Sequence, residues 1–341
     1  MNVPHHPFPT PPGEGHATEV APGILWLRLP LPMALDHVNC YALADDDGWT
    51  LVDTGISDDL GRAVWQTLLG TPLRGKPVTR LLVTHHHPDH IGLAGWFQSR
   101  GAELMITRTA WLYARMLTLD EQHLPSPESM QFYHRAGLSA EQRAAKARQR
   151  PFNFRDMVAP LPLGFTRLAE NDILTAAGRR WRVRLGQGHA PDHAMLWSLD
   201  DHLILAGDQL LSTISAHIGV YPTEPGADPL TDWLASTRAL MDLAKADHLV
   251  LPGHKLPFSG LPQRLEQMLT DHETALTRLV THLSEPRRAT ECFPVLFKRP
   301  IVEQTFSLAL SESLAHLNCL TNRGMATRSL GADGAWLWRS L

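Results

Sequence analysis

Cysteine is scarce in this sequence, and long apolar runs are absent. The 341 residues include three cysteines, Cys40, Cys292 and Cys319, which lie far apart and form no Cys-x-x-Cys pair. A disulfide framework and a thiolate zinc site are therefore excluded. No stretch of about 18 uninterrupted apolar residues occurs, so the sequence predicts no membrane-spanning helix.

An excess of basic residues is also missing. The formal net charge of −4 disfavours a broadly basic surface for nucleic acid, although it permits a local basic patch. The hydrophobic fraction of 43% is typical of a globular protein rather than a disordered one. The Pro- and His-rich start lacks the order of a signal peptide. We therefore expect a flexible tail over residues 1–17 and a cytoplasmic protein.

Residues 18–107 alternate between strand-like and helix-like apolar spacing. Residues 18–55 read as antiparallel strands joined by turns. Residues 57–69 follow with helical spacing, a strand at 80–84 comes next, and residues 91–98 read as one helix. This alternation predicts an α/β fold built in layers.

Residues 108–165 interrupt this alternation with helix-like segments. Their aromatic content is high for a surface connection, and the basic residues near 143–150 are interpreted as one solvated helix face. An insertion of this length usually forms a lid or a substrate wall. A dimer contact is the alternative.

The strongest local pattern is His-x-His-x-Asp-His, formed by His85, His87, Asp89 and His90 after an apolar strand. Imidazole and carboxylate are the usual ligands of zinc and of similar divalent metals. One catalytic zinc keeps an open position and does not use four such ligands. The pattern therefore predicts two metals that share further ligands from elsewhere in the chain.

Three later strands end in a glycine followed by one candidate ligand, namely His189, Asp208 and His254. Loops that follow strands commonly carry such residues. His193, four residues after the first of these, is interpreted as a structural histidine. Asp53 ends an earlier strand, and two interpretations stay open from the residues alone: a turn former, or an acid that supports the metal site.

Together these motifs resemble the metallo-β-lactamase superfamily, and more closely its glyoxalase II-like and lactamase-β-2-like branch, over about residues 20–255. The resemblance implies a four-layer αβ/βα sandwich with the metals at one edge of the paired sheets. It also implies that Asp208 bridges the two metals and that Asp53 supports them. The implied ligands of the first metal are His85, His87 and His189, and those of the second are Asp89, His90 and His254.

The resemblance divides the chain at residue 258. Residues 18–258 would form the metallo-β-lactamase domain with its helical insertion. Residues 259–341 resemble a small helical and winged-helix-like domain, with a hairpin near residues 329–338. We favour a packing or dimerisation module over a nucleic-acid reader here, because acidic and basic residues are mixed.

The predicted function is hydrolysis of a small thioester or ester by a metal-bridging hydroxide. Asp89 and Asp53 are the catalytic candidates, while His217 and Tyr221 are candidate substrate contacts. Zinc is the first choice of metal, with iron and manganese open. A small-molecule substrate is favoured over nucleic acid, no membrane partner is expected, and a homodimer is an option.

Three alternatives stay open. They are a single-strand endoribonuclease, a lactonase and a mononuclear iron persulfide dioxygenase. The lactonase is disfavoured because Leu211 stands where the homoserine-lactone enzymes carry tyrosine. The dioxygenase is disfavoured because it uses fewer metal ligands than the seven found here.

Overall fold

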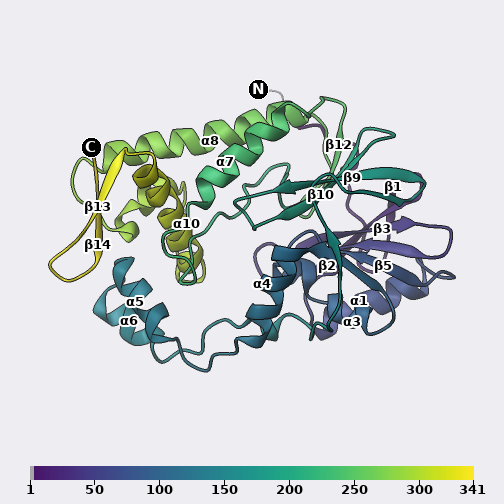
Figure 1. Ribbon diagram of the computed structural model, residues 1–341, viewed down its shortest axis with the longest axis horizontal. Helices are drawn as coiled ribbons and strands as arrows, with labels where there is room; N and C mark the ends of the chain where they lie inside the picture. The colour runs from purple at the N-terminus through teal and green to yellow at the C-terminus, as the bar shows by residue number, and fades with distance from the viewer. Residues whose placement is uncertain (1–3) are drawn as a thin grey trace. The chain divides into compact units, whose positions relative to one another are not determined.

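The computed structural model describes residues 4–341 (Figure 1), so the first three residues of the expected tail lie outside the described part. The chain forms two compact units. The first contains the described residues up to Glu121 together with Phe152–Ala216 and Ala244–Arg264, and the second contains Gln122–Pro151, His217–Leu243 and Leu265–Leu341. Each unit is therefore assembled from segments that are distant in sequence.

Two β-sheets form the first unit. The larger sheet runs in sequential order from β1 to β7, with antiparallel neighbours as far as β4 and parallel neighbours from β4 onward. The smaller sheet has the order β12-β11-β10-β9-β8, and its β11–β12 pair is parallel. The strands of the larger sheet are β1 (Thr18–Ala21), β2 (Ile24–Pro30), β3 (His37–Ala44), β4 (Trp49–Val52), β5 (Val78–Leu82), β6 (Glu103–Thr107) and β7 (Thr166–Leu168). Those of the smaller sheet are β8 (Ile173–Ala176), β9 (Arg179–Gly186), β10 (His193–Ser198), β11 (Leu203–Gly207) and β12 (Leu249–Pro252).

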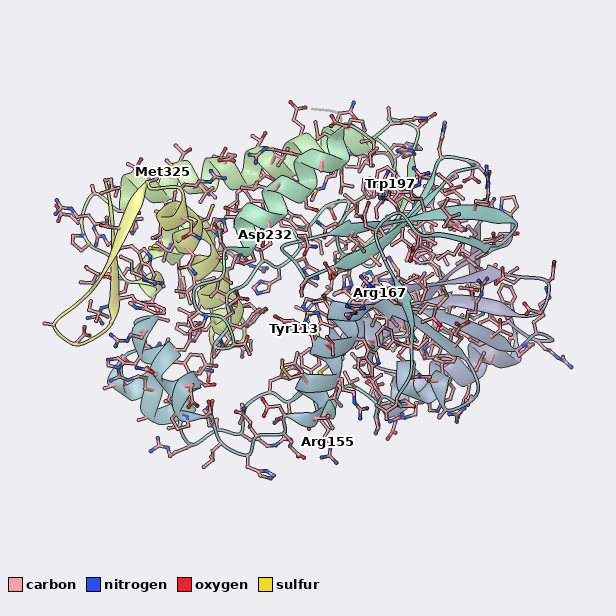
Figure 2. The ribbon with its side chains drawn as sticks, viewed as in Figure 1. Tyr113, Arg155, Arg167, Trp197, Asp232 and Met325 are labelled. Carbon is pink, nitrogen blue, oxygen red and sulfur yellow. The ribbon has the colours of Figure 1, made fainter. Side chains whose placement is uncertain are left out.

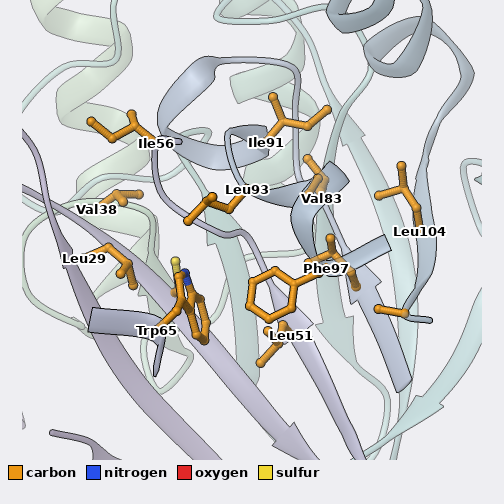
Figure 3. Packing of buried hydrophobic residues seen from close by; sticks show 14 of the residues in the cluster. Leu29, Val38, Leu51, Ile56, Trp65, Val83, Ile91, Leu93, Phe97 and Leu104 are labelled. Carbon is orange, nitrogen blue, oxygen red and sulfur yellow. The ribbon is translucent and has the colours of Figure 1, made fainter. Parts of the chain in front are cut away.

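Apolar side chains cover both faces of the larger sheet. One buried cluster joins it to the smaller sheet and includes Trp26 on β2 and Trp181 on β9. A second cluster joins its other face to the helices, where the rings of Trp65 and Phe97 meet edge to face at 4.9 Å above Leu51 (Figure 3). The resulting order of helices, sheet and sheet confirms the layered α/β fold.

The helices of the first unit follow the predicted pattern with one exception. The helix predicted at 57–69 is present, and its N-cap Asp58 accepts a hydrogen bond from the amide of Gly61 at 2.6 Å. The helix predicted at 91–98 is instead two short helices, because Leu93 adopts φ −97° and ψ 11°, outside the helical region. The helices are α1 (Asp59–Gly70), α2 (Pro88–Ile91), α3 (Ala94–Gln98), α4 (Arg108–Leu119) and the 3₁₀ turn η1 (Phe154–Asp156).

The described part of the N-terminal segment is bound to the first unit, which differs from the expected loose tail. His5 pairs with Ser259 in an antiparallel bridge, and His6 Nδ1 lies 3.0 Å from the carbonyl oxygen of Pro257. Phe8 packs against the core between the sheets. These contacts join residues some 250 positions apart in the sequence. The amino-acid composition of the N-terminal segment does not reveal them.

The second unit is mainly helical. Its C-terminal hairpin pairs Arg328 with Trp338, as predicted for residues 329–338. Part of the expected insertion packs here, since His134 Nε2 lies 2.8 Å from the carbonyl oxygen of Asp333. The expected boundary at 258 also differs from the boundary between the units, which falls inside a continuous helix, α8. The elements are α5 (Pro127–Arg135), α6 (Ala140–Lys146), α7 (Pro229–Met241), most of α8 (Leu261–His282), η2 (Ala289–Cys292), α9 (Phe293–Leu296), α10 (Glu303–Asn322), β13 (Ala326–Leu330) and β14 (Trp336–Ser340).

Across residues 4–341, none of the helices combines the length and apolarity that crossing a bilayer requires.

Candidate metal centre

The candidate ligands gather where strands of the two sheets end. The parallel strands β4 and β5 lead into Asp53 and the His85 cluster. The parallel strands β11 and β12 lead into Asp208 and His254. Parallel neighbours deliver the residues that follow them to the same end of a sheet. The first unit therefore brings all seven predicted ligands together, although they span some 170 residues of sequence.

Three imidazoles form the first group. His85 Nε2 lies 3.0 Å from His87 Nδ1 and 3.3 Å from His189 Nε2. Nitrogens bound to a tetrahedral zinc at about 2.0–2.1 Å would lie about 3.3 Å apart. The spacing of these three nitrogens therefore fits a shared cation.

The second group combines one carboxylate with two imidazoles. Asp89 Oδ2 lies 3.2 Å from His254 Nε2 and 3.6 Å from His90 Nε2. Like the first group, these three residues place their ligand atoms close enough to hold a metal ion.

Asp208 lies between the two groups. Its Oδ2 is 3.5 Å from His189 Nε2 of the first group and 3.3 Å from His254 Nε2 of the second. Its Oδ1 is 3.4 Å from His90 Nε2, and both of these atoms are buried without a hydrogen-bond partner. Buried polar atoms are nearly always paired, so these two atoms fit the ligands of a cation.

The electrostatics of the two groups differ. Burial and the neighbouring imidazoles lower the pKa of His85 and His87 far below its usual range, so both rings are neutral, as metal ligands must be. Burial alone would lower the pKa of His254, but the carboxylates of Asp208 and Asp89 raise it to about 10. The carboxylates therefore favour positive charge beside His254, which a proton on its ring or a bound cation supplies.

Asp53 contacts the candidate ligand His90 and the neighbouring Thr84. Its Oδ2 lies 2.7 Å from His90 Nδ1, and its two oxygens accept hydrogen bonds of 2.8 Å from the amide and hydroxyl of Thr84. The backbone at Asp53 has φ +61°, a left-handed turn conformation that is uncommon outside glycine. Trp65 fixes this turn by donating from Nε1 to the carbonyl oxygen of Thr54 at 2.7 Å. Asp53 is thus placed to act through His90, as a positioning residue.

Three further residues contact the candidate ligands or the loops that carry them. The amide of Asp208 donates to His193 Nε2 at 3.1 Å, which agrees with a structural role for this histidine. The carbonyl oxygen of His37 lies 2.7 Å from His254 Nδ1. Asn39 Nδ2 donates to the carbonyl oxygen of Pro252 at 2.9 Å. The sequence analysis missed both residues: the carbonyl oxygen of His37 leaves no side-chain signal, and the one signal for Asn39 is a polar side chain in an otherwise apolar strand.

The candidate substrate contacts His217 and Tyr221 belong to the second unit, whereas the ligands belong to the first. There His217 Nε2 lies 3.1 Å from Ser311 Oγ, and His217 Nδ1 lies 3.5 Å from Glu312 Oε2. The rings of His217 and Tyr221 are 6.4 Å apart. These contacts link the segment that carries His217 and Tyr221 to α10. A role of these two residues in substrate binding stays a prediction.

The two-sheet fold and the clustered imidazole and carboxylate side chains define a metal-binding α/β enzyme. Residues 33–254 match the family model described as the metallo-beta-lactamase superfamily. Residues 276–341 match the model of a metallo-beta-lactamase-like C-terminal domain. Since the first match covers more than half of the chain, the protein belongs to the metallo-β-lactamase superfamily, and it is a metallo-hydrolase. The glyoxalase II-like branch and the winged-helix character stay predictions.

Similar proteins extend over nearly the whole chain. A crystal structure of a beta-lactamase domain protein from Burkholderia ambifaria has 34% identity and a TM-score of 0.89, and the match covers 99% of this chain and 97% of that one. A metallo-beta-lactamase family protein from Thermus thermophilus has 29% identity and a TM-score of 0.79, over 94% of this chain and 100% of that one. The protein named "Probable metallo-hydrolase YqjP" from Bacillus subtilis is 24% identical over 87% of this chain and 92% of its own length.

Proposed function

We propose that this enzyme holds two divalent metal ions and hydrolyses a thioester or ester of a small molecule. The observation that carries the proposal is the position of Asp208 Oδ2, within 3.5 Å of a ligand nitrogen from each group. If the enzyme held a single metal ion, one of the two groups of three candidate ligands would bind no metal. Zinc is the first candidate, and iron and manganese suit the same donors.

The protein's own residues supply binding, orientation and a proton acceptor. Two bound ions would lower the pKa of a coordinated water and polarise the substrate's electrophilic oxygen. His90 is held by Asp53, and His254 by the carbonyl oxygen of His37. Asp89 is 20% exposed at its side chain, so its carboxylate can hold the attacking water and accept its proton.

The donor set favours hydrolysis over the alternatives. All seven predicted donors converge, more than a mononuclear iron site uses. Leu211, three residues after Asp208, is a buried leucine, so this position offers no tyrosine hydroxyl to a lactone. The net charge of −4 disfavours RNA as the main substrate.

Elemental analysis of the purified protein, run beside a panel of thioesters, esters, lactones and single-stranded RNA, tests the proposal. We expect about two ions per chain and turnover of the thioesters or esters. The variant Asp208→Asn should lower the metal content, whereas Asp200→Asn, a surface acid paired with Arg180 in the same unit, should not. One iron per chain with oxygen uptake, or turnover of RNA alone, would contradict the proposal.

A further inference from the structure

Helix α4 presents an apolar stripe to solvent in the first unit. Ala110 and Ala114 face the core, while Leu112, Met116 and Leu119 are each exposed by 47% or more. Their spacing of four and three residues places the three side chains on one face of the helix. A contiguous exposed apolar surface of this kind commonly marks a binding site.

Aromatic rings connect helix α4 to the candidate metal centre. Tyr113 projects from α4 (Figure 2), and its ring lies 5.3 Å from that of His86. The ring of Phe154 stacks on His86 at 6.1 Å and 11°, and Phe152 lies 5.9 Å beyond it. His86 is in turn 4.7 Å from the ring of the ligand His87. A row of rings therefore runs from the candidate ligand His87 to Tyr113 on α4, the helix that carries the exposed stripe.

His86 itself has no structural partner that explains it. It is 7% exposed, and its buried Nδ1 has no hydrogen-bond partner in the described structure. Its ring lies among the rings of Tyr113, Phe154 and His87, where an apolar side chain would pack equally well. The ring of His86 therefore extends the line of aromatic rings up to His87, beside which a substrate group would arrive.

We propose that this surface, made of His86, Tyr113, Phe152, Phe154 and the α4 stripe, binds the acyl chain or aryl group of the substrate. The inference rests on the proposed function and narrows it to thioesters or esters of apolar acids. The reacting carbonyl must lie beside the metal ligands, so the acyl group attached to it extends over the adjoining rings. A partner protein could cover the stripe, but it would leave the buried end of the surface, at His86, without a role.

The test is the dependence of kcat/KM on acyl length in a thioester series from acetyl to decanoyl. Each methylene buried on this surface should raise kcat/KM about fourfold until the surface is filled. The double variant Leu112→Ser, Met116→Ser should reduce the decanoyl-to-acetyl ratio at least tenfold with metal content intact. Leu60→Ser, at a leucine of α1 that is 50% exposed, is the matched control and should keep the wild-type ratio.

The outcomes separate the two proposals. Turnover of the acetyl thioester with no rise along the series would overturn the acyl surface and leave the hydrolase intact. No turnover of any thioester or ester would overturn the proposed function itself. If the double variant changes the sedimentation of the protein but not the chain-length ratio, the stripe is an interface between protein chains and the acyl assignment is wrong.

Discussion

The substitution Gly253→Ala tests the metal centre with a single methyl group. Gly253 precedes His254, and a Cβ at this position would lie 2.3 Å from Asp208 Oδ1 and 2.8 Å from His90 Cε1. Both neighbours are proposed ligands. The backbone at Gly253 cannot easily yield, because its amide donates to the carbonyl oxygen of Gly207 at 2.7 Å. The added methyl group must therefore displace the ligands.

The size of the effect follows from these distances. Ordinary contact begins near 3.4 Å, so a neighbour now at 2.3 Å must move by about 1 Å. Metal–ligand distances tolerate only about 0.2 Å. Misplacement of a reacting group by about 1 Å can cost roughly a hundredfold in rate. We expect metal affinity to fall at least as far as it does after loss of a supporting hydrogen bond, which is about 10- to 100-fold.

Competition with a chelator would give the metal affinity, and kcat/KM the activity. Gly70→Ala is the control: Gly70 ends α1 in the same unit, and a Cβ there meets nothing within 4 Å. It should match the wild type in both measurements. Wild-type affinity and activity in Gly253→Ala would show that Asp208 and His90 do not hold the ions in this geometry.

Three further outcomes are expected. His87→Ala should remove one ion and most of the activity, and full activity with full metal content would refute the first group. Asp53→Asn keeps the shape but not the charge beside His90, so metal affinity measured by competition should fall about 10- to 100-fold, and an unchanged affinity would exclude support through His90. In the second unit, burial and then the His316 imidazole lower the pKa of His272 from 6.5 to about 4. The neutral ring therefore stabilises the fold fully above pH 6.5, and that contribution, about 3 kcal/mol, is lost as the pH falls toward 4. Urea unfolding of His272→Gln should show a correspondingly smaller loss over this range, and an equal loss would contradict the assignment.

The sequence marks the candidate ligands by a local pattern, whereas the division of the chain into two units depends on distant contacts. The ligands were visible because each follows an apolar strand, and the end of a strand is a local pattern. The break between α2 and α3 is a change of backbone angles at Leu93, to φ −97° and ψ 11°, which the apolar spacing of this stretch does not reveal. The binding of His5 to Ser259 and the grouping of residues 122–151 with the C-terminal hairpin depend on contacts that are distant in sequence. No local spacing encodes them.

Asp53 shows why residue patterns alone left its role undecided. A turn former and a supporting acid seemed to be competing interpretations, yet the structure combines them. The left-handed backbone at φ +61° turns the chain at the end of β4. From this turn the carboxylate reaches both Thr84 and His90. Glycine would adopt the backbone at lower cost but would remove the carboxylate. The strained conformation is therefore explained by the side chain it presents, and the buried contact of Trp65 with Thr54 holds it in place.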